Sequence, residues 1–167
     1  MAEIKLKGTV IHTNGELPCV GSIAPDFELV KNDLSTLTLN ALRGKRVVLY
    51  IFPSLDTPTC AMSVRRFNKE ASALDNTWVL AISKDLPFAS ARFCSTEGIE
   101  NVIPLSAFRS DAFERAYGML IVDGPLSGLL ARGVAAIDEN GKVLYSRLVA
   151  EVTDEPDYAS VLEALKG

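Results

Sequence analysis

Apolar residues follow two different periods along this chain, and the two periods alternate. Continuous apolar runs at residues 47–52 and 78–83 predict strands that are buried on both faces of a sheet. Between these runs, apolar residues recur at intervals of three and four: Val64, Phe67, Ala71 and Leu74. This spacing places them on one side of a helix that begins near Cys60.

Shorter patterns predict the remaining elements. Strands are expected at residues 36–39, 101–105, 133–137 and 142–146, and helices at residues 87–96, 111–117 and 157–165. Residues 4–12 alternate around Gly8 and predict a β-hairpin, whereas residues 19–27 are expected to form a loop. Asn140-Gly141 between two strand patterns is a strong hairpin signal. The order predicts one α/β domain, residues 1–167, with a mixed central sheet and helices on both of its faces.

Composition restricts the class of protein. The 167 residues are 48% hydrophobic and 23% charged, which is typical of a globular protein, and the net charge is −4. A net negative charge argues against nucleic acid or an anionic membrane as the main partner. No apolar stretch approaches the roughly 20 residues that span a bilayer, and the first residues show no apolar signal core. We therefore expect a cytoplasmic protein.

The cysteines and the single histidine limit the available chemistry. Cys19, Cys60 and Cys94 are odd in number and widely spaced, which argues against a framework of structural disulfides. His12 lies in an alternating segment and is expected to be a strand residue rather than a catalytic one. With one histidine and no closely spaced cysteines, we expect no metal site.

Cys60 is the strongest candidate for a reactive group. Thr57 is suited to cap a helix, and Pro58 then occupies the first helical position, where its missing N–H costs nothing. Cys60 falls in the first turn, where unpaired N–H groups and the helix dipole favour a thiolate. Pro53 makes the preceding loop rigid and can shield the sulfur. The alternative is that Cys60 only packs at the helix start, as most helical cysteines do.

The segment Pro53-x-x-x-Thr57-x-x-Cys60 resembles the active-site signature of the peroxiredoxins. Residues 21–27 resemble the N-terminal loop of that family. Further segments resemble its bacterial thiol peroxidase subgroup: residues 52–57, 63–68, 85–89, 116–118 and 123–126. The segments occur in the family's order and cover nearly the whole chain. The sequence is therefore identified as similar to this subgroup.

The resemblance implies a thioredoxin-like fold and assigns roles to five residues. Cys60 would be the peroxidatic cysteine, Thr57 would orient the peroxide and Pro53 would shield the pocket. Arg132 matches the active-site arginine of the family, although its residue type alone suggests a surface cation at a strand edge. Cys94 matches the resolving cysteine, although alone it suggests a packed thiol in a helix.

The resemblance also implies a catalytic cycle without metal, flavin or haem. Hydrogen peroxide or an organic hydroperoxide would oxidise Cys60 to a sulfenic acid, Cys94 would form an intramolecular disulfide with it, and thioredoxin would reduce the disulfide. A homodimer is implied as well. Because both cysteines are predicted in helices, we expect the helix ends around them to unwind during the cycle. Of the two, the segment around Cys94, close to Gly98, is expected to move more.

Two other interpretations stay open at this stage. Cys60-Ala61-Met62-Ser63 is a Cys-x-x-Ser arrangement, which suits a glutaredoxin-like disulfide reductase, and a redox-sensing or chaperone module is the other alternative. Cys19 has no counterpart in the family pattern and is expected to be a bystander. Four apolar residues are expected either to line a substrate pocket or to belong to the core: Phe88, Phe93, Leu120 and Ile121.

Overall fold

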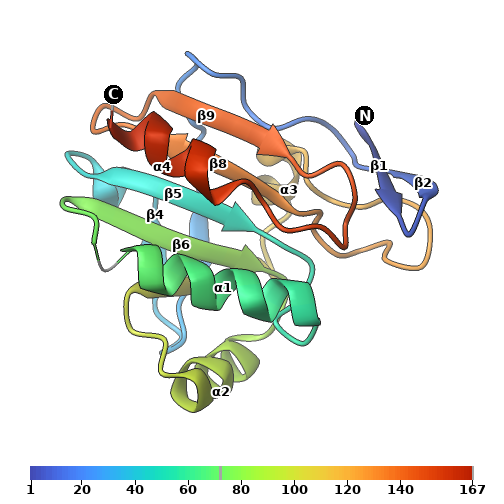
Figure 1. Ribbon diagram of the computed structural model, residues 1–167, viewed down its shortest axis with the longest axis horizontal. Coiled ribbons are helices and arrows are strands. Elements are labelled where there is room, and N and C mark those ends of the chain that lie inside the picture. Colours follow the sequence, from blue (N-terminus) through green and yellow to red (C-terminus); the bar gives the residue numbers. More distant parts are fainter. Residues whose placement is uncertain (72, 167) are drawn as a thin grey trace.

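A seven-stranded mixed sheet forms the centre of the computed structural model, which describes residues 1–71 and 73–166 (Figure 1). Its strands, in chain order, are β3 (Glu28–Val30), β4 (Thr36–Thr38), β5 (Arg46–Ile51), β6 (Thr77–Ser83), β7 (Val102–Ser106), β8 (Gly133–Ile137) and β9 (Val143–Leu148). They lie side by side in the order β4-β3-β7-β6-β5-β8-β9. The predicted mixed α/β sheet is therefore confirmed.

Helices cover both faces of this sheet, as predicted. They are α1 (Pro58–Ala71), α2 (Pro87–Glu97), α3 (Asp111–Tyr117) and α4 (Tyr158–Lys166), with a short 3₁₀ turn at Asn40–Leu42. Helices α1 and α4 lie in front of the sheet in Figure 1 and pack on the side chains of Val48 and Tyr50. Helix α3 packs on the opposite face, against Leu49 and Ile51. This alternation is the period of two expected for a strand buried on both faces.

The three central strands are parallel, and the strands beside them reverse direction. β5 pairs with β6 and β6 with β7 in parallel, with α1 and α2 as the crossover connections. β8 runs antiparallel to β5, and β9 antiparallel to β8. The Asn140-Gly141 turn between β8 and β9 forms as predicted, and Gly141 takes the positive φ of 85° that such turns require.

The register between β5 and β8 determines which loops meet. Ile51, the last residue of β5, lies opposite Gly133, the first residue of β8. Because the strands are antiparallel, the residue before β8 lies beside the residue after β5. Arg132 and the loop that follows Phe52 therefore converge at the same edge of the sheet.

A separate two-stranded hairpin, β1 (Glu3–Leu6) and β2 (Thr9–His12), packs beside the main sheet (Figure 1). Ile4 and Ile11 are buried in the same core as α3. His12 is the last residue of β2, as expected of a strand residue. Its backbone N–H donates to Asp123 Oδ1, and its Nδ1 lies 2.7 Å from Oδ2 of the same carboxylate. The predicted N-terminal hairpin is thus confirmed and tied to the loop that contains Asp123.

Two local features differ from the sequence prediction. The three-residue strand β3 was not predicted, because a strand this short presents too few positions to show a period. Leu74 lies beyond the end of α1 instead of on its predicted helical face, yet it still packs against the same core. The other predicted elements form within one to three residues of their expected bounds. Among the described residues, no helix is long and apolar enough to cross a membrane.

Two glycines that end helices offer a matched test of backbone packing. Gly118 ends α3 with a φ of 63°, and Gly98 ends α2 with a φ of 66°. A Cβ at Gly118 would lie 2.2 Å from the backbone nitrogen of Glu16, whereas a Cβ at Gly98 would meet nothing within 4 Å.

We predict that Gly98→Ala lowers the free energy of unfolding by about 1–2 kcal/mol, the cost of a left-handed alanine. Gly118→Ala carries the same cost plus the clash with the Glu16 backbone, and is expected to lose about 3 kcal/mol or more. Urea unfolding of both variants measures the difference. Equal losses would show that the segment around Glu16 moves away freely.

Candidate active site

Cys60 is the third residue of α1 and is fully buried. Helix α1 begins at Pro58, and the Ala61 N–H donates to the Thr57 carbonyl at 3.0 Å, the first hydrogen bond of the helix. Thr57 therefore occupies the N-cap position through its carbonyl, and Cys60 lies in the first turn, as predicted. At this position the helix dipole favours negative charge on the sulfur.

Arg132 is fixed directly beside the sulfur. Its Nη1 donates to Cys60 Sγ at 3.2 Å and to the Tyr50 hydroxyl at 2.6 Å. Its Nε and Nη2 both donate to the Val152 carbonyl, at 3.1 and 2.8 Å. Only 2% of Arg132 is exposed, which excludes a surface cation at a strand edge. Three partners, the Cys60 sulfur, the Tyr50 hydroxyl and the Val152 carbonyl, thus fix the orientation of the guanidinium.

The cluster places one buried positive charge beside the Cys60 sulfur. Burial acts to lower the pKa of Arg132, but its electrostatic interactions and hydrogen bonds with Tyr50 and Cys60 raise it, so the guanidinium stays positive. Burial raises the pKa of the Tyr50 hydroxyl well above its usual range, although the nearby Arg132 charge acts to lower it, so Tyr50 is neutral. Cys60 is therefore the group that can supply the counter-charge of this buried cation.

The loop between β5 and α1 holds the other two predicted residues. Pro53 is buried two residues after the end of β5. The Thr57 hydroxyl donates to the Ser54 carbonyl at 3.1 Å, and its oxygen can still accept another hydrogen bond. Both residues lie in the loop that leads to Cys60, as their sequence positions predict.

The Asp85 carboxylate secures this loop. It accepts hydrogen bonds from the Ser54 hydroxyl at 2.7 Å and from the Leu55 N–H at 2.8 Å, both in the β5–α1 loop. It also accepts from the Ser83 hydroxyl at 2.8 Å, at the end of β6. One carboxylate therefore joins the loop before Cys60 to the strand that leads into α2.

Cys94 lies in the last turns of α2 and is not bonded to Cys60, because all three cysteines are free. It lines a cavity of about 280 Å³ together with Asn32 from the β3–β4 loop and Pro104 from β7. Burial raises the pKa of the Cys94 thiol, while the Asn32 side chain acts in the opposite direction. The structure thus places Cys94 in a half-buried pocket on a part of the sheet different from that of Arg132.

Two ion pairs connect α2 to the elements around Cys60. Arg92 Nη2 lies 3.6 Å from Asp56 in the loop before α1, and Arg65 in α1 lies 3.0 Å from Glu97. In the sequence, Asp56 and Arg65 flank Cys60, and Arg92 and Glu97 flank Cys94. Helix α2 therefore runs beside the start of α1 without joining the two sulfurs.

The remaining candidates do not form part of this cluster. Cys19 is exposed in the loop after the N-terminal hairpin. The four apolar residues do not gather in one pocket: Ile121 belongs to the α3 side of the core, Phe93 packs on the α1 side, and Phe88 is 67% exposed. In residues 1–71 and 73–166, no three His, Cys, Asp or Glu side chains are grouped so as to hold a metal ion.

Sequence reasoning missed two partners of Arg132. Tyr50 carried a signal, because a hydroxyl within a strand that is buried on both faces must find a hydrogen-bond partner. Val152 carried none, because its contribution is a backbone carbonyl that any residue would supply. Both lie at the edge of the sheet where β5 ends and β8 begins.

Comparison with known proteins agrees with this geometry. Residues 19–162 match the model of the Redoxin family. The chain is 54% identical to a thiol peroxidase of Mycobacterium tuberculosis and 53% identical to one of Corynebacterium glutamicum, over 99% of each chain. It also superimposes on a peroxiredoxin-like protein from Aquifex aeolicus with a TM-score of 0.94 and 38% identity, covering 99% of this chain and 96% of the other. The chain belongs to the Redoxin family and, within it, to the thiol peroxidases.

Proposed function

We propose that this chain is a thiol-dependent peroxidase that reduces hydrogen peroxide and organic hydroperoxides at Cys60. The observation that carries the proposal is the 3.2 Å contact between the Arg132 guanidinium and the Cys60 sulfur, in the first turn of a helix. A buried cation and a helix N-terminus both stabilise the nucleophilic thiolate. The thiol peroxidase relatives support the same activity.

In the first step, the Cys60 thiolate attacks the terminal oxygen of the hydroperoxide. A sulfur–oxygen bond forms, the oxygen–oxygen bond breaks, and the departing oxygen takes up a proton to leave as water or an alcohol. Arg132 stabilises the charge that moves from sulfur to oxygen, because its donors already point at the reacting atoms. Thr57 orients the peroxide, and Pro53 limits access of water.

In the second step, the Cys94 thiolate attacks the Cys60 sulfenic acid and releases hydroxide. The two sulfurs must first approach each other. Cys60 lies beside Arg132 at the start of β8, whereas Cys94 lies beside β7, and three interstrand spacings of about 4.8 Å separate β7 from β8. A disulfide needs Cα atoms within roughly 7 Å. The helix ends around both cysteines therefore unwind, with the end of α2 at Gly98 as the more mobile one.

A dithiol protein of the thioredoxin type then reduces the disulfide by thiol exchange, and two copies of the chain form a homodimer in the cytoplasm. The peroxiredoxin resemblance supports these assignments.

The disulfide reductase alternative is poorly supported, because a sulfur that attacks protein disulfides must be exposed and Cys60 is fully buried. Ser63 instead uses its hydroxyl to donate to the Thr59 carbonyl within α1.

One equivalent of hydrogen peroxide is expected to join Cys60 to Cys94 and to leave Cys19 reduced. Peptide mapping by mass spectrometry after alkylation identifies the joined pair. Cys94→Ser should retain a Cys60 sulfenic acid that a dimedone probe labels, whereas the control Cys19→Ser should form the same disulfide as the parent chain. Oxidation at Cys19 alone, with Cys60 still reduced, would refute the proposed function.

Arg132→Lys is expected to slow the oxidation of Cys60 by about 100-fold or more. Lysine keeps the charge but loses the planar fork that reaches sulfur, Tyr50 and Val152 together. The second-order rate constant with hydrogen peroxide measures the effect, and Arg147→Lys, at an exposed position in β9, is the control. A loss of less than threefold in Arg132→Lys would show that charge alone is sufficient.

Disulfide formation is expected to accelerate as the pH rises from about 6 to about 9. Burial raises the pKa of Cys94, so little of it is thiolate at neutral pH, and each added pH unit increases that fraction by up to about tenfold. Single-turnover kinetics separate this step from the oxidation of Cys60. A rate of disulfide formation that does not change with pH would contradict attack by an ionising Cys94.

A further inference from the structure

The carbonyl that fixes Arg132 belongs to a segment held by the N-terminal hairpin. This segment, residues 150–153, follows β9 and contains Val152. The Lys5 N–H donates to the Ala150 carbonyl at 2.7 Å, and the Val152 N–H donates to the Lys5 carbonyl at 2.8 Å. The segment therefore lies along β1 as a parallel neighbour, with Lys5 opposite Glu151.

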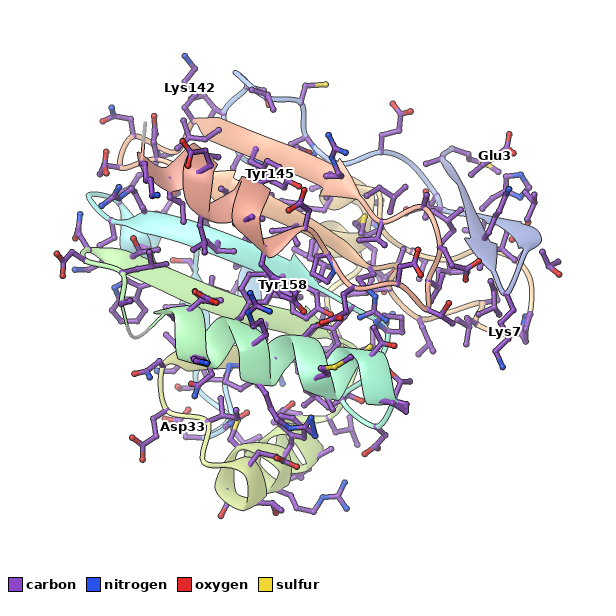
Figure 2. All side chains as sticks on the ribbon, in the orientation of Figure 1. Glu3, Lys7, Asp33, Lys142, Tyr145 and Tyr158 are labelled. Carbon is purple, nitrogen blue, oxygen red and sulfur yellow. The ribbon has the colours of Figure 1, made fainter. Side chains whose placement is uncertain are left out.

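The Glu151 carboxylate binds the tip of the same hairpin. It accepts the Lys7 N–H at 2.8 Å on Oε1 and the Gly8 N–H at 3.1 Å on Oε2. Lys7 and Gly8 both have positive φ, 51° and 86°, so that consecutive N–H groups of the turn converge on one anion. Figure 2 shows Lys7 at the tip of the hairpin. The hydrogen bond from the Lys7 N–H, aided by that from Gly8, lowers the pKa of Glu151, which is therefore ionised at neutral pH.

The segment also contacts the helix that carries Cys60. The Thr59 hydroxyl donates to the Thr153 carbonyl at 3.1 Å, one residue before Cys60. The Thr153 hydroxyl in turn donates to Glu151 Oε1 at 3.1 Å. Residues 151–153 therefore bond the hairpin on one side, and both Arg132 and the first turn of α1 on the other.

We propose that Glu151 is a positioning residue for peroxide reduction, which anchors the Val152 carbonyl to the hairpin so that Arg132 faces the Cys60 sulfur. The proposal rests on the proposed function of Cys60 and Arg132. Two of the guanidinium nitrogens share the Val152 carbonyl, so a shift of that carbonyl turns the guanidinium and lengthens its contact with sulfur. Displacements of about 1 Å at a reacting centre cost up to about 100-fold in rate.

The test compares Glu151→Ala with Glu163→Ala, which removes a carboxylate on the exposed face of α4 that lies 3.7 Å from Lys166 Nζ. Single-turnover kinetics with hydrogen peroxide give two rate constants, one for oxidation of Cys60 and one for disulfide formation. Glu151→Ala is expected to slow oxidation roughly tenfold and to leave disulfide formation unchanged within about twofold, because Cys94 lies on a different part of the sheet. Glu163→Ala should change neither constant.

Glu151→Gln carries the test if Glu151→Ala does not fold. Glutamine keeps one carbonyl oxygen for the Lys7 N–H, so oxidation is expected to slow by less than in Glu151→Ala but by more than in Glu163→Ala. Both constants changing together would indicate general loosening of the fold and would overturn the proposal. An unchanged oxidation rate would overturn it as well.

A double-mutant cycle shows whether Glu151 acts through Arg132. In the Arg132→Lys background, Glu151→Ala is expected to slow oxidation by less than about twofold, because the guanidinium that it positions is absent. The same slowing in both backgrounds would contradict the proposal. If the parent chain itself leaves Cys60 unoxidised, the proposed function fails, a result distinct from failure of the role of Glu151.

Discussion

A buried positive charge organises this end of the molecule. Arg132 is 2% exposed, and an isolated cation at such a position would be strongly destabilising. Its donors reach the Tyr50 hydroxyl, the Cys60 sulfur and the Val152 carbonyl. Tyr50 and Val152 supply dipoles, but only Cys60 can supply a negative charge. In the proposed function, the pairing of charges that stabilises the buried arginine is the same pairing that makes the sulfur nucleophilic.

The sheet topology explains why this pairing is available. In a parallel sheet, the loops that follow the strands lie at one edge, and the loop after β5, which leads to Cys60, therefore lies there. An antiparallel strand beside β5 starts at that same edge, and β8 therefore delivers the residue that precedes it, Arg132. β9 then ends there too and leads into residues 150–153. Two successive antiparallel pairings, β5 with β8 and β8 with β9, thus bring three separate segments of chain together.

Sequence patterns predicted the fold better than they predicted the site. Long strands and helices carry their own periodicity, whereas the three residues of β3 do not. The position of Cys60 followed from Thr57 and Pro58, because capping is a local property. Arg132 depended on the family resemblance, since the register between β5 and β8 is not local information. The Val152 carbonyl was out of reach, because a backbone acceptor has no sequence signature.

The arrangement proposed to activate Cys60 also limits what its sulfur can do next. In the proposed thiolate form, the sulfur is held by Arg132 and by the first turn of α1, and both interactions are strongest while it carries a negative charge. In the proposed cycle, oxidation converts that thiolate into a neutral sulfenic acid. The electrostatic attraction then weakens at the moment when the sulfur has to leave its pocket and meet Cys94. Asp85 bonds the loop before α1 to the end of β6, and these hydrogen bonds do not depend on the charge of the sulfur. In the proposed cycle, loss of one charge would thereby couple the chemical step to the unwinding that the disulfide requires.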